Sequence, residues 1–157
     1  MHLTSVARKA GHSSASADRS VRHSFDAGAI AKLCAEAFRG IPGCGEGDHF
    51  LDKTERILGG RYGPLVESAS LIAVDADSAV TGVILVTEYA PYGAPVVALI
   101  ATAPSVRRQG AGRALLDRSI EEMTRLGIRH CCANIDSGNG LSEAFFSACG
   151  FVAETDA

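Results

Sequence analysis

The chain has 157 residues, 46% of them hydrophobic, and a formal charge of −3 at neutral pH. This length and composition predict one folded domain over 20–157 with a substantial core, preceded by a disordered tail over 1–19. The mild acidity argues against nucleic acid as a main partner, because such proteins usually present a basic face. No apolar run reaches the about 18 residues that span a bilayer, so we expect no membrane segment.

The cysteines match neither a disulfide framework nor a zinc pattern. They are Cys34, Cys44, Cys131, Cys132 and Cys149. His130 adjoins two of them, but no second cluster of metal ligands exists in the sequence. We therefore expect buried, reduced thiols, typical of a reducing cytoplasm, and no metal.

The first elements are a predicted strand over 21–25 and a helix that Asp26 caps. From Ile30 to Phe38, apolar residues recur at i, i+3, i+4, i+7 and i+8, which indicates one buried helix face. The glycine-rich segment 41–47 is predicted to be a loop, and a second helix is expected over 48–58.

Three strands are predicted next. Residues 69–74 and 80–87 are expected to form a hairpin around the turn at Asp75-Ala76-Asp77. The continuous apolar run 96–101 is typical of a strand covered on both faces, at the centre of a sheet.

After Pro104 we expect a helix over 110–126, a strand over 129–135, a helix over 141–149 and a short strand from Phe151. The alternation of these elements predicts a mixed α/β sheet with helices packed on it.

A loop rich in glycine and arginine joins the central strand to the next helix, and residues 107–113 read Arg-Arg-Gln-Gly-Ala-Gly-Arg. The first turn of a helix has unpaired N–H groups and a positive dipole end, and glycine lets a ligand approach them closely. The loop therefore predicts an anion site that suits a diphosphate. It lacks the third glycine of the dinucleotide fingerprint and the Gly-Lys-Ser/Thr of a P-loop, which disfavours a nicotinamide enzyme and an NTPase.

This segment resembles motif A of the GCN5-related N-acetyltransferase (GNAT) superfamily, whose signature is Gln or Arg, two residues, Gly, one residue, then Gly or Ala. The matching residues are Arg107, Gly110 and Gly112, followed downstream by Asn139, Phe145-Phe146 and Gly150-Phe151. The resemblance covers about residues 20–151. It implies the GNAT fold, a mixed and mostly antiparallel sheet flanked by helices, with a short or missing C-terminal strand in this chain.

The resemblance further implies acetyl-CoA as co-substrate and transfer of its acetyl group to a primary amine by direct attack in a ternary complex. The pantetheine arm would pair with the central strand as an added strand does, and the diphosphate would lie on the loop. The residues so expected to bind the cofactor are Ile100, Ala101, Thr102, Arg107, Arg108, Gln109, Gly110, Ala111, Gly112, Arg113 and Asn139. Asn139 is equally well placed to cap the following helix.

Two departures from the family pattern concern catalysis. Phe146 stands where many members carry a tyrosine that protonates the departing thiolate. The central strand has no carboxylate to act as general base, which leaves Glu88 as the best candidate and Tyr89, Tyr92 and Asp136 as others. A non-catalytic acyl-CoA-binding regulatory module therefore remains an alternative function.

A third departure is the short segment after Gly150-Phe151, because members of the family usually continue into one or two further strands. The strand ending near Ile135 would then have an unpaired edge. We expect a second copy of the chain to pair with that edge, which predicts a homodimer.

The acceptor is expected to bind along 38–64, the segment that supplies substrate contacts in similar proteins. Its acids, Glu46, Asp48 and Glu55 beside His49, favour a cationic amine on a small molecule or peptide.

Overall fold

The computed structural model describes residues 2–6, 21–22, 25–41, 48–107, 109–135 and 139–154. Within these ranges the elements follow in the order β1 (His2–Val6), β2 (Val21–Arg22), α1 (Ala27–Ala37), α2 (His49–Leu58), η1 (Glu67–Ala69), β3 (Leu71–Val74), β4 (Val80–Tyr89), η2 (Ala90–Tyr92), β5 (Ala94–Thr102), η3 (Pro104–Val106), α3 (Ala111–Arg125), β6 (His130–Asn134), α4 (Gly140–Ala148) and β7 (Phe151–Glu154).

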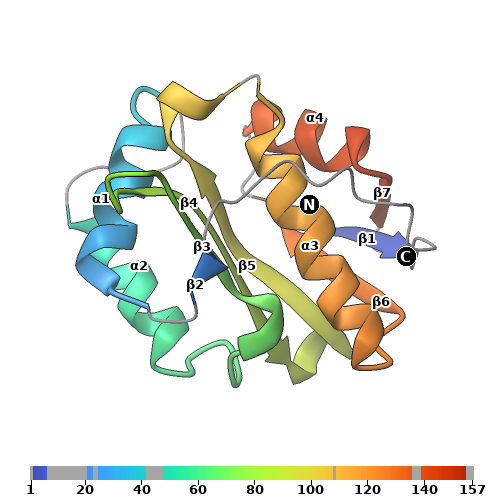
Figure 1. Ribbon diagram of the computed structural model, residues 1–157. Coiled ribbons are helices and arrows are strands. Elements are labelled where there is room, and N and C mark those ends of the chain that lie inside the picture. Colours follow the sequence, from blue (N-terminus) through green and yellow to red (C-terminus); the bar gives the residue numbers. More distant parts are fainter. Residues whose placement is uncertain are drawn as a thin grey trace.

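The strands form one seven-stranded sheet in the order β2-β3-β4-β5-β6-β1-β7. All neighbouring strands run antiparallel except β5 and β6, which are parallel. The expected mixed, mostly antiparallel α/β sheet is confirmed, as is the central position of β5 (Figure 1).

The helices begin close to where their sequences predict, and they bury the predicted faces. The Asp26 carboxylate accepts a hydrogen bond of 3.1 Å from the backbone N–H of Ala29, which caps α1 as expected. The buried face of α1 consists of Ile30, Leu33, Cys34 and Ala37. In the described part of the chain, no helix is both long and apolar enough to cross a membrane.

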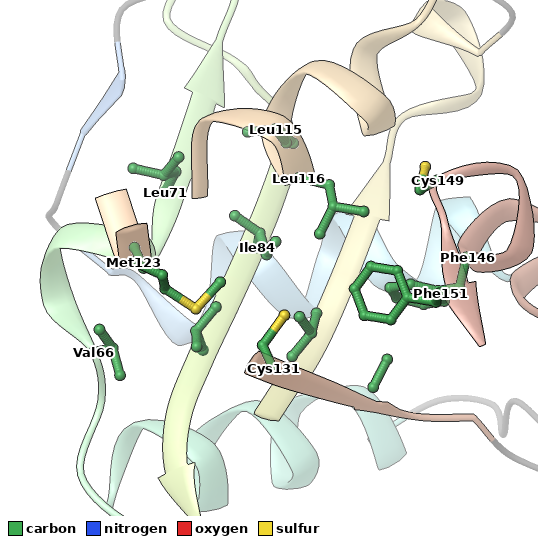
Figure 2. Packing of buried hydrophobic residues seen from close by; sticks show 14 of the residues in the cluster. Val66, Leu71, Ile84, Leu115, Leu116, Met123, Cys131, Phe146, Cys149 and Phe151 are labelled. Atoms are coloured by element: carbon green, nitrogen blue, oxygen red, sulfur yellow. The ribbon is translucent and has the colours of Figure 1, made fainter. Parts of the chain in front are cut away.

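The core has two layers, one on each face of the sheet. Alternate residues of β4 point to opposite faces, so Val83 and Leu85 pack with α1 and α2, while Ile84 and Val86 pack with α3. Figure 2 shows the second layer, where Leu116 of α3 lies over the sheet. The site described below lies where the sheet between these layers opens.

The described cysteines belong to this core. Cys34, Cys131, Cys132 and Cys149 are buried and unbridged, whereas Cys44 lies outside the described residues. Burial raises the pKa of the Cys34 and Cys131 thiols to about 12, because the low-dielectric interior disfavours a thiolate. These thiols stay protonated near neutral pH and act as small apolar groups.

The N-terminal strand β1 corrects the prediction of a disordered tail over 1–19. His2–Val6 lies between two strands and pairs antiparallel with β6 on one side and β7 on the other. The serine- and alanine-rich N-terminus has a weak local signal for a strand, and the partners that order it lie far away in the sequence. The remaining residues of that stretch lie outside the described ranges.

The same strand corrects the expectation of an open edge on β6. All of β6 pairs with β1, from Val6↔His130 to His2↔Asn134. The chain therefore covers this edge itself, and the ground for expecting a second copy there is wrong.

A proline in β1 tests this placement. Thr4 pairs with Cys132 of β6 and with Val152 of β7. Because proline has no N–H to donate to either neighbour, Thr4→Pro should lower the free energy of unfolding by about 2 kcal/mol or more. Thr4→Val keeps the N–H and the strand preference and should be nearly neutral. Urea unfolding compares the two variants, and equal stability would contradict a paired β1.

Candidate active site

The site begins where β5 and β6 separate. These strands pair only at Val96↔Cys132 and Val97↔Ala133, whereas β4 stays paired with β5 as far as Thr102. On the side facing β6, residues 98–102 therefore have no partner strand among the described residues. Backbone groups left open in this way can pair with an extended ligand.

A β-bulge marks the start of the separation. The pairing of β4 with β5 passes from Val86↔Val97 to Leu85↔Leu99, so Ala98 has no partner residue on β4. As a result the consecutive residues Ala98 and Leu99 both pack against the α1–α2 layer. A bulge bends its strand and re-aims its backbone groups, here at the point where β5 leaves β6.

Three adjoining cavities follow β5 along this opening. The α3 cavity, of about 420 Å³, is lined by residues 100–102 of β5 together with Arg107 and Gly112. The junction cavity, of about 60 Å³, is lined by residues 97–100. The tyrosine cavity, of about 390 Å³, is lined by Val96 and Ala98 together with three tyrosines.

Shared lining residues show that the three cavities adjoin one another along β5. The α3 and junction cavities share Phe38, Ile100, Asn139 and Ser142. The junction and tyrosine cavities share Lys53, Ala98 and Asn134. Two ligands could therefore enter from opposite ends and meet beside the bulge.

The N-terminus of α3 lies at one end of this path. Gly110 is the N-cap, with a left-handed φ of 74°, and no side chain of a described residue caps the helix. The N–H groups of the first helical turn therefore remain open to a ligand. Arg113 adds a positive charge, held near Asp117 with an Nε–Oδ2 distance of 3.9 Å. This geometry fits the predicted anion site.

The other predicted loop residues lie around this helix end. Arg107 lines the α3 cavity, and its guanidinium donates a hydrogen bond to the carbonyl of Ala37 at the end of α1. Gln109 is exposed and donates to the carbonyl of Ser105 at 3.3 Å. Ala111 is the first residue of α3, and Arg108 lies outside the described residues.

Gly112 keeps the α3 cavity open. A Cβ at this position would lie 3.3 Å from the Phe145 ring and 3.7 Å from the Thr102 methyl group. Any side chain here would therefore narrow the passage between α3, α4 and β5.

Asn139 both caps α4 and lines the cavities, the two placements that the sequence leaves open. Its side-chain oxygen accepts a hydrogen bond of 3.1 Å from the N–H of Ser142, which caps α4. It is also buried and lines both the α3 and the junction cavities. The capping prediction is confirmed, and the same side chain reaches the path along β5.

The tyrosine cavity is assembled from distant segments. Tyr62 and Tyr89 lie edge to face with ring centroids 6.1 Å apart, and Tyr89 and Tyr92 do so at 5.1 Å. Opposite them α2 presents a polar stripe, consisting of His49, Asp52, Lys53 and Arg56. Lys53 and Tyr62 belong to the segment 38–64 that is expected to bind the acceptor, but neither is among the residues singled out there, and Asn134 is not predicted. The polar stripe at helical spacing in 49–56 is a signal for Lys53 alone.

Glu88, the candidate base, lies outside the three cavities, whereas Phe146, at the usual tyrosine position, lies in a cavity wall. Glu88 is exposed near the end of β4 and is absent from the linings of these three cavities. Its neighbour Tyr89 lines the tyrosine cavity, so strand alternation directs Glu88 to the other face. Phe146 is buried in the wall of the junction cavity. Asp136 lies outside the described residues, and Glu88 as the base stays a prediction.

A close backbone approach supports the loop that carries Tyr62. Gly63 has a φ of 90°, and a Cβ there would lie 1.9 Å from the carbonyl oxygen of Glu88. Gly60 has a similar φ of 87° with open space around it. Only the contact with β4 therefore distinguishes the two glycines.

This difference predicts unequal effects of the same substitution. Gly60→Ala should cost about 1 kcal/mol, the strain of a left-handed alanine. Gly63→Ala adds the clash with Glu88 and should cost at least about 2 kcal/mol more. Urea unfolding of both variants measures the difference, and equal losses would show that this approach is not present in solution.

Known structures share this architecture. A GCN5-related N-acetyltransferase from Sphaerobacter thermophilus superposes with a TM-score of 0.70 at 18% identity, over 98% of this chain and 47% of that one. This chain thus spans about half the length of that protein. The PaiA N-acetyltransferase from Thermoplasma acidophilum, solved with coenzyme A, gives 0.67 at 18% identity, over 88% of this chain and 92% of that one.

A third structure, AAC(6')-Iy with the bisubstrate analogue CoA-S-monomethyl-acetylneamine, gives a TM-score of 0.57 at 21% identity, over 88% of this chain and 93% of that one. At these identities the similarity shows the fold alone. A search of curated protein sequences finds no match. The sequence profile of the acetyltransferase (GNAT) family, however, matches residues 34–151. The match takes in the opened strand, the α3 loop and the capped helix α4, and the chain belongs to the acetyltransferase (GNAT) family.

Proposed function

We propose that this acyltransferase moves an acetyl group from acetyl-CoA to the primary amine of a small molecule or protein, by direct attack in a ternary complex. The observation that carries the proposal is the row of adjoining cavities along β5, which begins at the uncapped end of α3 and ends at the tyrosine cavity. Related folds solved with coenzyme A and with a CoA-linked aminoglycoside analogue support both halves of this assignment.

Acetyl-CoA would enter from the α3 cavity. Its diphosphate would accept hydrogen bonds from the backbone N–H groups of 110–113, with Arg113 adding charge. The pantetheine amides would pair with the open side of β5 at 100–102, and Asn139 would contact the arm from α4. The thioester would then lie in the junction cavity beside Ala98.

The acceptor amine would approach from the tyrosine cavity. It must lose its proton before attack, because an ammonium has no lone pair. The oxyanion that forms on the thioester carbon needs a donor, and a backbone N–H of β5 near the bulge is suitably placed.

Two protons must be accounted for in this scheme: the one that leaves the amine and the one that the departing thiolate would take up. Tyr89 and Tyr92 line the cavity of the amine, so a water held by their hydroxyls could carry its proton to solvent. Glu88 faces away from this cavity, so it could act as the base only through a chain of such waters. Phe146 has no proton for the thiolate. A CoA thiol resembles free cysteine, whose pKa is about 8.5, so the thiolate can leave without help.

The second candidate is a regulatory module that binds acyl-CoA without turnover. The placement of Phe146 and Glu88 favours it, since neither supplies an acid or a base to the junction cavity. The rate of thiol release from acetyl-CoA with a panel of amines separates the two functions. Amine-dependent release supports the transferase, and tight binding without release supports the module.

A negative charge introduced at the N-terminus of α3 tests the diphosphate site. Asn and Asp both tolerate the left-handed backbone of Gly110 and have nearly the same shape, so Gly110→Asp and Gly110→Asn differ mainly in charge. The aspartate should weaken binding of coenzyme A about tenfold or more relative to the asparagine, through repulsion of the diphosphate.

Calorimetry at low and high salt measures this ratio. The ratio should fall as salt screens the repulsion, and pantetheine, which has no diphosphate, should bind both variants equally. Equal affinity of the two variants for coenzyme A would show that the diphosphate does not bind at this helix end.

A further inference from the structure

The charged groups around the tyrosine cavity do not balance. Arg56 is neutralised by Asp52, with an Nε–Oδ2 distance of 3.0 Å between them. Lys53 makes no ion pair with a described residue, although it lines both the tyrosine cavity and the junction cavity. The described walls thus leave one uncompensated lysine charge where the two cavities meet.

The position of Lys53 differs from that of the other charged residues of α2. His49, Asp52 and Arg56 line the tyrosine cavity alone. Among the described residues that line the junction cavity, Lys53 is the only charged one, and its neighbours there are apolar, amide or hydroxyl side chains. In the proposed function its charge would therefore lie beside the reacting amine rather than beside the distal part of an acceptor.

We propose that the acceptor is an amino acid, or a similar amine with a carboxylate one or two bonds from its amine carbon, and that Lys53 binds this carboxylate. The inference rests on the proposed function, because it takes the junction cavity as the place of the thioester.

Geometry restricts the acceptor to this class. The amine must reach the junction cavity, and a group bound by Lys53 at the same place must be close to the amine in the molecule. A carboxylate satisfies both conditions and replaces the water that the ammonium of Lys53 would otherwise retain. The remainder of the acceptor would extend over Tyr62, Tyr89 and Tyr92, which suits an apolar or aromatic side chain.

The same charge disfavours the cationic amine expected from the acids of 46–55. Asp48 and Glu55 are exposed and line none of the three cavities, and Glu46 lies outside the described residues. The acid that does line the tyrosine cavity, Asp52, is already paired with Arg56. An acceptor without an anionic group would bring its ammonium toward Lys53, whose charge no described acid neutralises, and be repelled.

The decisive comparison uses phenylalanine and phenylalanine amide as acceptors, with acetyl-CoA and detection of released thiol. The amide has the less basic amine, so a site that ignores the carboxylate would acetylate the amide faster near neutral pH. The proposal predicts the opposite order, with kcat/KM about 10- to 100-fold higher for the free acid, the effect of one charge-assisted hydrogen bond. The difference should lie mainly in KM.

Variants then connect this preference to Lys53. Lys53→Met should reduce the ratio of acid to amide to about one or below, and Lys53→Arg should retain part of it. Lys32→Met is the matched control, because Lys32 is exposed on α1 and lines none of these cavities. It should leave the ratio unchanged. Thermal unfolding of each variant shows whether the protein remains folded.

A binding measurement gives the same information without turnover. In the presence of coenzyme A, N-acetylphenylalanine should bind at least about tenfold more tightly than its amide, and Lys53→Met should remove the difference. Equal binding of the two ligands by the wild type would overturn the proposal.

Three further results would overturn it. These are equal or faster acetylation of the amide, an equal loss for acid and amide in Lys53→Met, and transfer to polyamines or amino sugars but to no amino acid. The last result would leave the proposed acetyl transfer intact. Absence of thiol release with every amine would instead overturn the proposed function itself.

Discussion

The separation of β5 from β6 is the constraint on which the site depends. After two paired positions the strands part, and the backbone groups of residues 98–102 on that side have no strand partner in the described part of the chain. Buried backbone groups without partners are costly, so such an opening is stable only where water or a ligand reaches it. The adjoining cavities along β5 meet this condition.

Other features of the fold keep this opening in place. β4 remains paired along the far side of β5, and the bulge at Ala98 bends the strand where the gap begins. Arg107 connects the segment after β5 to the end of α1, and Asn139 caps α4 at the opposite wall. Farther along the sheet, β1 covers the remaining edge of β6, so the sheet can open at β5 while β6 stays paired on its other side.

The parts of the fold that the sequence predicts depend on local signals. The Asp26 cap, the apolar spacing of α1, the continuous apolar run of β5 and the glycine loop before α3 each belong to one short segment, and the structure contains each of them. The pairing of β1 with β6 and β7 could not be predicted in this way. It joins the two ends of the chain, and its stability comes from partners that local propensity does not include.

The candidate site also has one part that a local sequence signal predicts and one part that depends on residues distant in the sequence. The α3 end of the path comes from one loop and was predictable, whereas the tyrosine cavity combines Tyr89, Lys53 and Asn134 from three elements with Tyr62 from the loop after α2. Arg107 matched a family signature, yet the direction of its side chain toward Ala37 depends on packing between η3 and α1. The predicted anion site is thus encoded by a local motif, whereas the tyrosine cavity depends on tertiary structure.

The central claim is that the open side of β5 is the binding surface for the acyl-CoA arm. Amide hydrogen exchange, with and without acetyl-CoA, measures this directly. The claim predicts slower exchange in residues 98–102 and at the start of α3 when acetyl-CoA is bound, with little change in β3 or β7. Binding of acetyl-CoA without added protection in 98–102 would contradict it.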